Sequence, residues 1–174
     1  MANVDRPHGF LAIGTLNGAD PAVRFFVKAA ADATLLGIGD FVEITGALNT
    51  VGRAETGDDI LGSTTAYGAA SKLTDQPVNP AFADTIFEGQ ETGTAATLGT
   101  ASEGLNANFV VADANSTTGI SQMEIDSDTE ATTATLDLKL WKVAPYADND
   151  GTLANSRWFV LVNRRLLSDQ STGV

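Results

Sequence analysis

The stretch Arg157-Trp-Phe-Val-Leu-Val-Asn163 decides the fold class, because every residue between its polar ends is apolar. In a strand, Trp158, Val160 and Val162 point to one face, and the two residues between them point to the other. A strand that is apolar on both faces lies at the centre of a covered sheet or presses against a neighbouring subunit. The sequence leaves both interpretations open.

The preceding stretch, Thr135-Leu-Asp-Leu-Lys-Leu140, alternates strictly between apolar and polar residues. Leu136, Leu138 and Leu140 share one face, which is typical of a half-buried strand with one solvated side. The alternation breaks at Trp141-Lys142. We therefore expect a β-bulge or the end of the strand at this point.

Further short apolar runs surround these two stretches, separated by clusters of Gly, Asn, Asp, Ser and Thr. The chain contains 21 Thr, which favours strands, and 17 Gly, which favours turns. The pattern predicts an all-β fold, a compact β-barrel or β-sandwich of about eight short strands with an extended N-terminal arm. The predicted strands cover residues 23–28, 41–45, 59–66, 84–88, 109–112, 122–126, 135–143 and 157–163.

The chain shows no internal repeat and no linker, so its organisation is simple. We expect an N-terminal arm or turn-rich lead-in over residues 1–20, a single β domain over 21–167 and a flexible tail over 168–174. Two prolines predict a rigid extended loop at Gln76–Pro80. Two further segments, 28–36 and 94–105, are candidates for a single helical turn.

Composition excludes several functional classes. The 174-residue chain has no Cys and one His, which rules out thiolate metal sites and cysteine nucleophiles and argues against histidine-centred catalysis. Its formal net charge of −12 argues against nucleic acid and anionic membranes as partners. The first ten residues lack the apolar run of a signal peptide, and no stretch is long enough for a membrane span, so we expect a soluble protein of a cytoplasm.

The net charge is concentrated in the middle of the chain. Between Arg53 and Leu138 there are two bases and fourteen acids, whereas acids and bases balance in the remainder. One interpretation is an acidic, solvated side opposite a neutral side that can dock. The other is that the charge only keeps the surface soluble.

Local motifs predict turns and no catalytic centre. The segments Asp126–Glu130 and Asp148–Gly151 resemble calcium loops, but the first lacks the required Gly and the second lacks ligands, so both are predicted as turns, with weak calcium binding left open. Gly37-Ile-Gly39-Asp40 is a fragment of a dinucleotide-binding motif and is predicted as a turn that enters a strand. Carboxylate pairs arise by chance in so acidic a chain. We predict no enzyme, no catalytic residues, no resident metal and no cofactor.

The order of features along the whole chain carries a resemblance. A Pro-His-Gly-Phe opening leads into a first strand punctuated by Gly, and short motifs follow in a fixed order. These are Gly39-Asp-Phe-Val42, Ile60-Leu-Gly62, Phe87-Glu-Gly-Gln-Glu91, Gly104-Leu-Asn-Ala-Asn-Phe-Val-Val111, Thr117-Thr-Gly-Ile-Ser-Gln-Met-Glu-Ile-Asp-Ser127, Leu138-Lys-Leu-Trp-Lys142 and Asn155-Ser-Arg-Trp-Phe-Val-Leu-Val-Asn163. Taken together, they resemble the capsid cement, or decoration, proteins of tailed bacteriophages.

The resemblance implies a structural virion protein, made in the bacterial cytoplasm, that binds the outer surface of the phage head. Such a protein clamps neighbouring major capsid subunits, stabilises the mature capsid and associates with itself as a dimer or trimer. Its expected partners are the major capsid protein and further copies of itself. Candidate contact residues are Arg6, Pro7, His8 and Phe10 in the arm, and Trp158, Phe159, Arg164 and Arg165 near the C-terminus.

Two other functions stay open at the level of sequence. One is another virion β module, such as the base of a head fibre or a component of the neck or tail. The other is an enzyme or small-ligand binder, which requires a buried polar pocket containing a carboxyl with a strongly shifted pKa.

Overall fold

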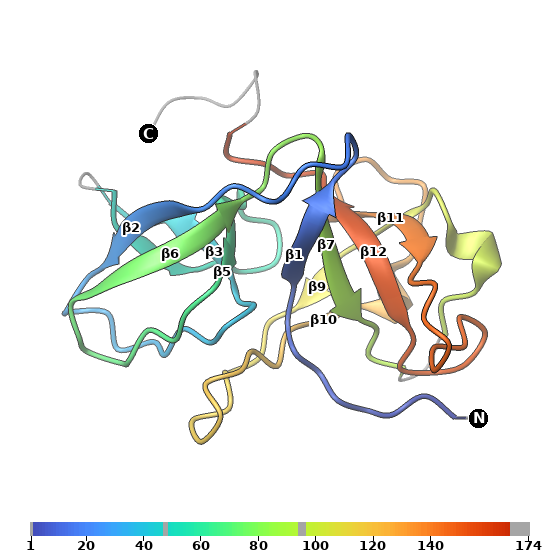
Figure 1. Ribbon diagram of the computed structural model, residues 1–174, viewed down its shortest axis with the longest axis horizontal. Helices are drawn as coiled ribbons and strands as arrows, with labels where there is room; N and C mark the ends of the chain where they lie inside the picture. Colours follow the sequence, from blue (N-terminus) through green and yellow to red (C-terminus); the bar gives the residue numbers. More distant parts are fainter. Residues whose placement is uncertain (1, 47–48, 94–96, 168–174) are drawn as a thin grey trace.

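The computed structural model describes residues 2–46, 49–93 and 97–167, so the tail predicted over 168–174 lies outside the described residues. The fold is all-β, as predicted, with twelve strands in two five-stranded antiparallel sheets and one hairpin (Figure 1). Neither sheet closes into a barrel. The described residues form no α-helix, and only two short 3-10 helices occur, η1 (Thr100–Ser102) and η2 (Ser127–Thr129).

The first sheet, which we call sheet A, contains both stretches that decided the fold class. Its order is β1 (Leu11–Thr15), β7 (Thr85–Gln90), β12 (Arg157–Val162), β11 (Leu138–Val143) and β8 (Asn106–Ala107). β12 is the central strand, and its residues alternate between half-buried and buried along its length. The register between β11 and β12 shifts between Leu140 and Lys142, which confirms the predicted bulge.

The second sheet, sheet B, is strongly curled. Its order is β2 (Arg24–Lys28), β6 (Thr74–Pro80), β5 (Gly62–Thr64), β3 (Phe41–Ile44) and β4 (Val51–Arg53). A single parallel bridge between Val27 and Thr50 brings its two outer strands together without a continuous ladder. The separate hairpin pairs β9 (Phe109–Val110) with β10 (Glu124–Ile125).

Each of the eight predicted strands overlaps an observed strand, but four observed strands were not predicted. One of them, β6, overturns the loop predicted at Gln76–Pro80, because it pairs with β2 on one side and β5 on the other. The fixed φ of proline suits extended backbone, and proline lacks only the N–H donor. The carbonyl of Pro77 still accepts a hydrogen bond from the backbone N–H of Thr65, at 3.0 Å.

Residues 28–36, one of the two candidates for a single helical turn, form no helix. Lys28 is the last residue of β2, and the chain then turns, with the N–H of Asp32 donating to the carbonyl of Ala29. The side chain of Lys28 is fully buried, and its ammonium donates to the Asp32 carbonyl at 2.8 Å. Burial and pairing of this one lysine outweigh the intrinsic helix propensity of the alanines. In the second candidate, residues 94–96 lie outside the described residues, and η1 begins after Gly99.

The predicted lead-in contributes to the domain. β1 lies within residues 1–20 and pairs with β7 of sheet A. Asn3 donates to the carbonyls of Asp150, Leu153 and Ala154, and so ties the first residues to the loop between β11 and β12. In this structure the N-terminal segment, residues 2–10, therefore lies against the end of sheet A rather than projecting from the domain (Figure 1).

A single aromatic cluster joins the two sheets. Phe41 of β3 stacks on Phe10 at a ring separation of 4.2 Å and meets Phe87 of β7 and Phe109 of β9 edge-on. All four rings are buried. Aromatic pairs in such geometry add to the free energy gained by burying their surface, so this cluster holds the sheets in place. A second, smaller core fills the curl of sheet B, formed by Leu36, Val42, Val51, Leu61 and Val78.

Within the described residues, no helix has the length and apolar character needed to cross a lipid bilayer.

Candidate interaction surface

The outer face of sheet A carries large apolar side chains among its charged ones. The inward residues of β12 are fully or almost fully buried, whereas Phe159 and Leu161 point outward and are only half-buried. Of the two interpretations that the sequence left open, a covered core strand describes only the inner face of β12. The outer face is the side that the sequence left open to a neighbouring subunit.

The β-bulge in β11 adds a second aromatic ring to this face. Trp141 lies at the bulge, is 40% exposed and packs on Phe159 with ring centroids 6.3 Å apart. Tyr146, in the loop after β11, is 38% exposed and meets the edge of the same ring at 6.1 Å. Because Lys142 pairs with Phe159 across the strands, and Lys139 pairs with Leu161, two lysines border the aromatic rings. We call this surface the aromatic face: Trp141, Tyr146, Phe159 and Leu161, with Lys139, Lys142 and Arg157.

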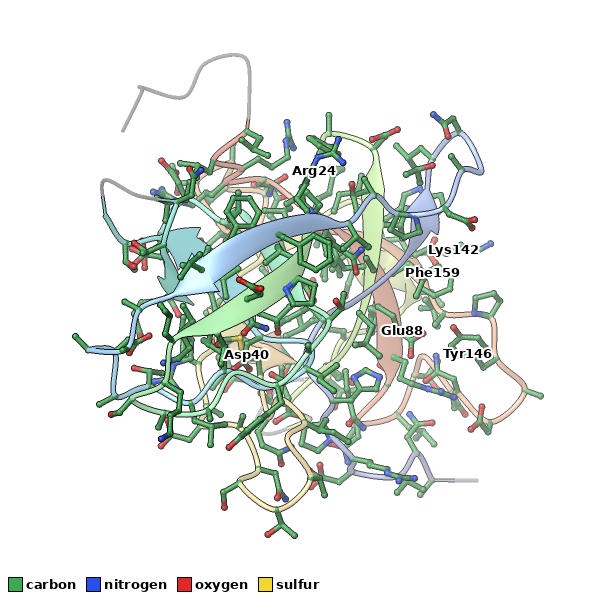
Figure 2. All side chains as sticks on the ribbon, turned by 60° about the vertical axis from the view of Figure 1, so that its left-hand side comes forward. Arg24, Asp40, Glu88, Lys142, Tyr146 and Phe159 are labelled. Atoms are coloured by element: carbon green, nitrogen blue, oxygen red, sulfur yellow. The ribbon has the colours of Figure 1, made fainter. Side chains whose placement is uncertain are left out.

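A buried carboxylate supports the aromatic face from the neighbouring strand. Glu88 of β7 pairs with Phe159, and its side chain lies close to Tyr146 (Figure 2). Its carboxylate accepts hydrogen bonds from the hydroxyl of Tyr146 at 2.6 Å and from Nε2 of His8 at 3.3 Å. Burial alone would raise the pKa of Glu88, but these two hydrogen bonds and the charge of Arg157 outweigh it, so its pKa is lowered. Burial and the bond to Glu88 raise the pKa of Tyr146 to about 12. Both groups keep their ordinary charge at neutral pH.

Arg157 fixes the position of the Tyr146 ring from its other side. Its guanidinium lies over that ring, 4.5 Å from the centroid, and forms an ion pair with Asp148 at 2.5 Å. A second carboxylate, that of Glu88, lies 4.0 Å away. The loop that carries Tyr146 is thus held by a cation–π contact and by charged hydrogen bonds. The aromatic face is consequently preorganised, which lowers the entropy lost when a partner binds.

Three of the four arm candidates, Arg6, Pro7 and His8, lie along the end of sheet A. Arg6 is exposed, and its backbone N–H donates to Gln90 at 3.0 Å, while the Pro7 carbonyl accepts from Gln122 at 3.4 Å. His8 is half-buried against Glu88. Phe10 is fully buried in the aromatic cluster between the sheets, so the expectation that it contacts a partner is corrected.

The four C-terminal candidates separate into three environments. Phe159 belongs to the aromatic face, but Trp158 is fully buried and donates its ring N–H to the hydroxyl of Ser156, so it also drops out as a surface contact. Arg164 forms an ion pair with Asp59 at 3.6 Å, and Arg165 donates to the Val162 carbonyl. The structure does not bring these two arginines into the aromatic face.

Sequence reasoning missed Trp141 and Tyr146 as site residues. The break in alternation at Trp141-Lys142 was a usable signal, because a bulge can turn a strand residue onto the apolar face of its neighbour. No local pattern singles out Tyr146. Its position depends on Glu88 and Arg157, which lie 58 residues before it and 11 residues after it in the chain.

The acidic motifs serve as structural turns. Asp126 caps η2 by accepting a hydrogen bond from the N–H of Asp128, and Asp150 accepts from both the N–H and the hydroxyl of Thr152. Asp40 accepts from the N–H of Gly37 at 2.7 Å at the entry to β3, as predicted for that turn. In the part of the chain that the structure describes, no group of three or more acidic or histidine side chains is arranged to hold a metal ion.

Comparison with known proteins gave no match: no protein-family model, no curated protein and no solved structure matches this chain.

Proposed function

We propose that this protein is a structural virion protein that binds the outer surface of a tailed-phage head and clamps neighbouring major capsid subunits. On this proposal the two sheets are the layers of a β-sandwich, and further copies associate as a dimer or trimer. The observation that carries the proposal is the aromatic face, a preorganised surface of exposed aromatic rings bordered by bases. Aromatic and arginine side chains of this kind are enriched where proteins bind proteins.

The clamping role follows from binding thermodynamics. A protein that binds the expanded capsid lattice better than separated subunits stabilises the lattice by the difference between the two binding free energies. A head displays many equivalent sites, and a copy that contacts two subunits gains from the effective concentration of the second contact. The affinity of each single contact can therefore be modest, because the many contacts act together.

Reconstitution of heads tests the proposal. Purified protein is mixed with mature heads that lack it and with free coat protein, and both mixtures are sedimented. We expect the protein to co-sediment with heads at hundreds of copies per particle and to leave free coat protein in the supernatant. Absence from the head pellet at saturating protein contradicts the proposal. A saturating number of six or twelve copies instead indicates a neck or tail component.

A further inference from the structure

Of the three bases of the aromatic face, Arg157 forms ion pairs with Asp148 and Glu88, whereas Lys139 and Lys142 form none with the acids next to the face. Three carboxylates border the face, and each is already engaged within the protein. Glu88 accepts from Tyr146 and His8, Asp148 pairs with Arg157, and Glu103 accepts from the backbone N–H of Val143.

The two lysines keep their positive charge available. The ammonium of Lys139 donates to the carbonyl of Gly104 at 2.9 Å, which satisfies one donor and leaves the charge uncompensated. Lys142 is exposed. Among the described residues, neither lysine lies within ion-pair distance of a carboxylate. In a chain of net charge −12, these are two bases without a carboxylate partner next to exposed aromatic rings.

We propose that the aromatic face binds an acidic surface of its partner, in which Asp or Glu carboxylates meet Lys139 and Lys142 while apolar atoms cover Trp141 and Phe159. This inference takes the identity of the partner, the major capsid protein, from the proposed function. Charge complementarity of this kind sets the orientation and the rate of association, and the aromatic rings supply most of the affinity.

Two other occupants fit the charges less well. In a twofold dimer built on this face, the same patch meets itself, and the lysines of both copies are brought together. Nucleic acid requires a field of many bases, which two lysines do not supply. The experiments below would detect either a second copy or nucleic acid on this face.

A fluorescence titration tests the chemistry of the face without a phage particle. Of the two tryptophans, Trp158 is fully buried and Trp141 is 40% exposed, so a change confined to the face is a change at Trp141. Poly-L-glutamate at low salt is expected to shift the emission of the wild type and to leave Trp141→Phe and the double variant Lys139→Glu/Lys142→Glu unaffected. No shift, an equal shift in the charge-reversed protein, or a shift produced by duplex DNA instead overturns the proposal.

Head binding tests the partner. The matched control for the double variant is Arg24→Glu/Lys72→Glu, which reverses two exposed bases that also lack a carboxylate partner among the described residues. Trp141→Ala is matched by Phe25→Ala, whose ring is 73% exposed on β2. We expect the face variants to bind heads at least about tenfold more weakly and the controls to stay within about twofold of the wild type.

The outcomes separate this inference from the proposed function. If the wild type fails to bind heads, the proposed function fails, while the glutamate titration still decides the preference for acids. If the wild type binds and the face variants bind equally well, only this inference fails. Circular dichroism and thermal unfolding confirm that each variant is folded. Dissociation of a wild-type oligomer by Trp141→Ala, seen in sedimentation equilibrium, assigns the face to a second copy and overturns the inference.

Discussion

At the scale of the residue, the turn at Asp40 buries a carboxyl group, and burial makes its charged form unfavourable. Its side chain is fully buried at the entry to β3, where it accepts from the N–H of Gly37. Burial raises its pKa from 3.8 to about 6, although hydrogen bonds with Ser121 and Gly37 oppose the shift. The sequence predicted the turn, because Gly-Ile-Gly-Asp is a local pattern. It did not predict the burial or the contact with Ser121, which lies 81 residues further along the chain.

The substitution Asp40→Asn tests this shift. A carboxyl whose pKa is higher in the folded state holds its proton more tightly there, so its contribution to stability is present below about pH 4 and is lost as pH rises through 6. Asparagine keeps an acceptor for Gly37 and does not titrate. Between pH 4 and pH 7, the wild type should lose up to about 3 kcal/mol of unfolding free energy that the variant retains. Urea unfolding at four pH values measures the difference, and parallel stability curves would contradict it.

At the scale of the element, the alternation of apolar and polar residues was informative where one face of a strand is exposed to solvent. It predicted β11 and its bulge, while the all-apolar run of β12 left a central strand and an interface strand both open. It could not predict β1 and β6, since a strand with Gly or Pro in it forms only because partners elsewhere in the chain supply the hydrogen bonds. For the same reason the N-terminal segment looked like a free arm. Phe10 holds this segment to the domain by stacking on Phe41, a contact that the local sequence does not indicate.

Two truncations distinguish the contribution of residues 2–7 to stability from that of the buried Phe10. Deletion of residues 2–7 removes mainly polar contacts, and we expect it to lower the free energy of unfolding by about 1–2 kcal/mol. Deletion of residues 2–10 also removes the buried ring of Phe10 and should cost a further 3–5 kcal/mol, roughly the cost of truncating a buried Phe. Chemical unfolding of the two proteins measures the step. Equal stabilities would show that Phe10 is not an anchor.

At the scale of the whole molecule, composition was a better guide than local pattern. The abundance of Thr and Gly indicated an all-β fold, which the structure has. The charge map indicated two kinds of surface, but sequence position could not assign them to faces. The lysines of the aromatic face come from β11, just beyond the acidic middle of the chain, and only the pairing with β12 places them beside Phe159.

The excess of carboxyl groups makes the stability of the fold fall as pH rises. Burial raises the pKa of Glu124 to about 7, with help from Asp5 and Glu91, and it also raises the pKa values of Glu91 and Asp137. Each of these carboxyls, like Asp40, contributes stability at low pH that is lost as pH rises through its folded-state pKa, and the net charge of −12 adds repulsion over the same range.

The melting temperature should therefore rise as pH falls from 8 to 5, by at least about 5 °C for a chain of this size. The lowered pKa of Glu88 acts in the opposite direction, but its contribution is lost only below the ordinary pKa of 4.5. Sodium chloride should raise the melting temperature more at pH 8 than at pH 5, because it screens repulsion between charges that are fewer at the lower pH. Calorimetry at two pH values and two salt concentrations measures both effects. A higher melting temperature at pH 8, or an equal response to salt at both pH values, would mean that repulsion and buried carboxyls do not control the stability of this fold.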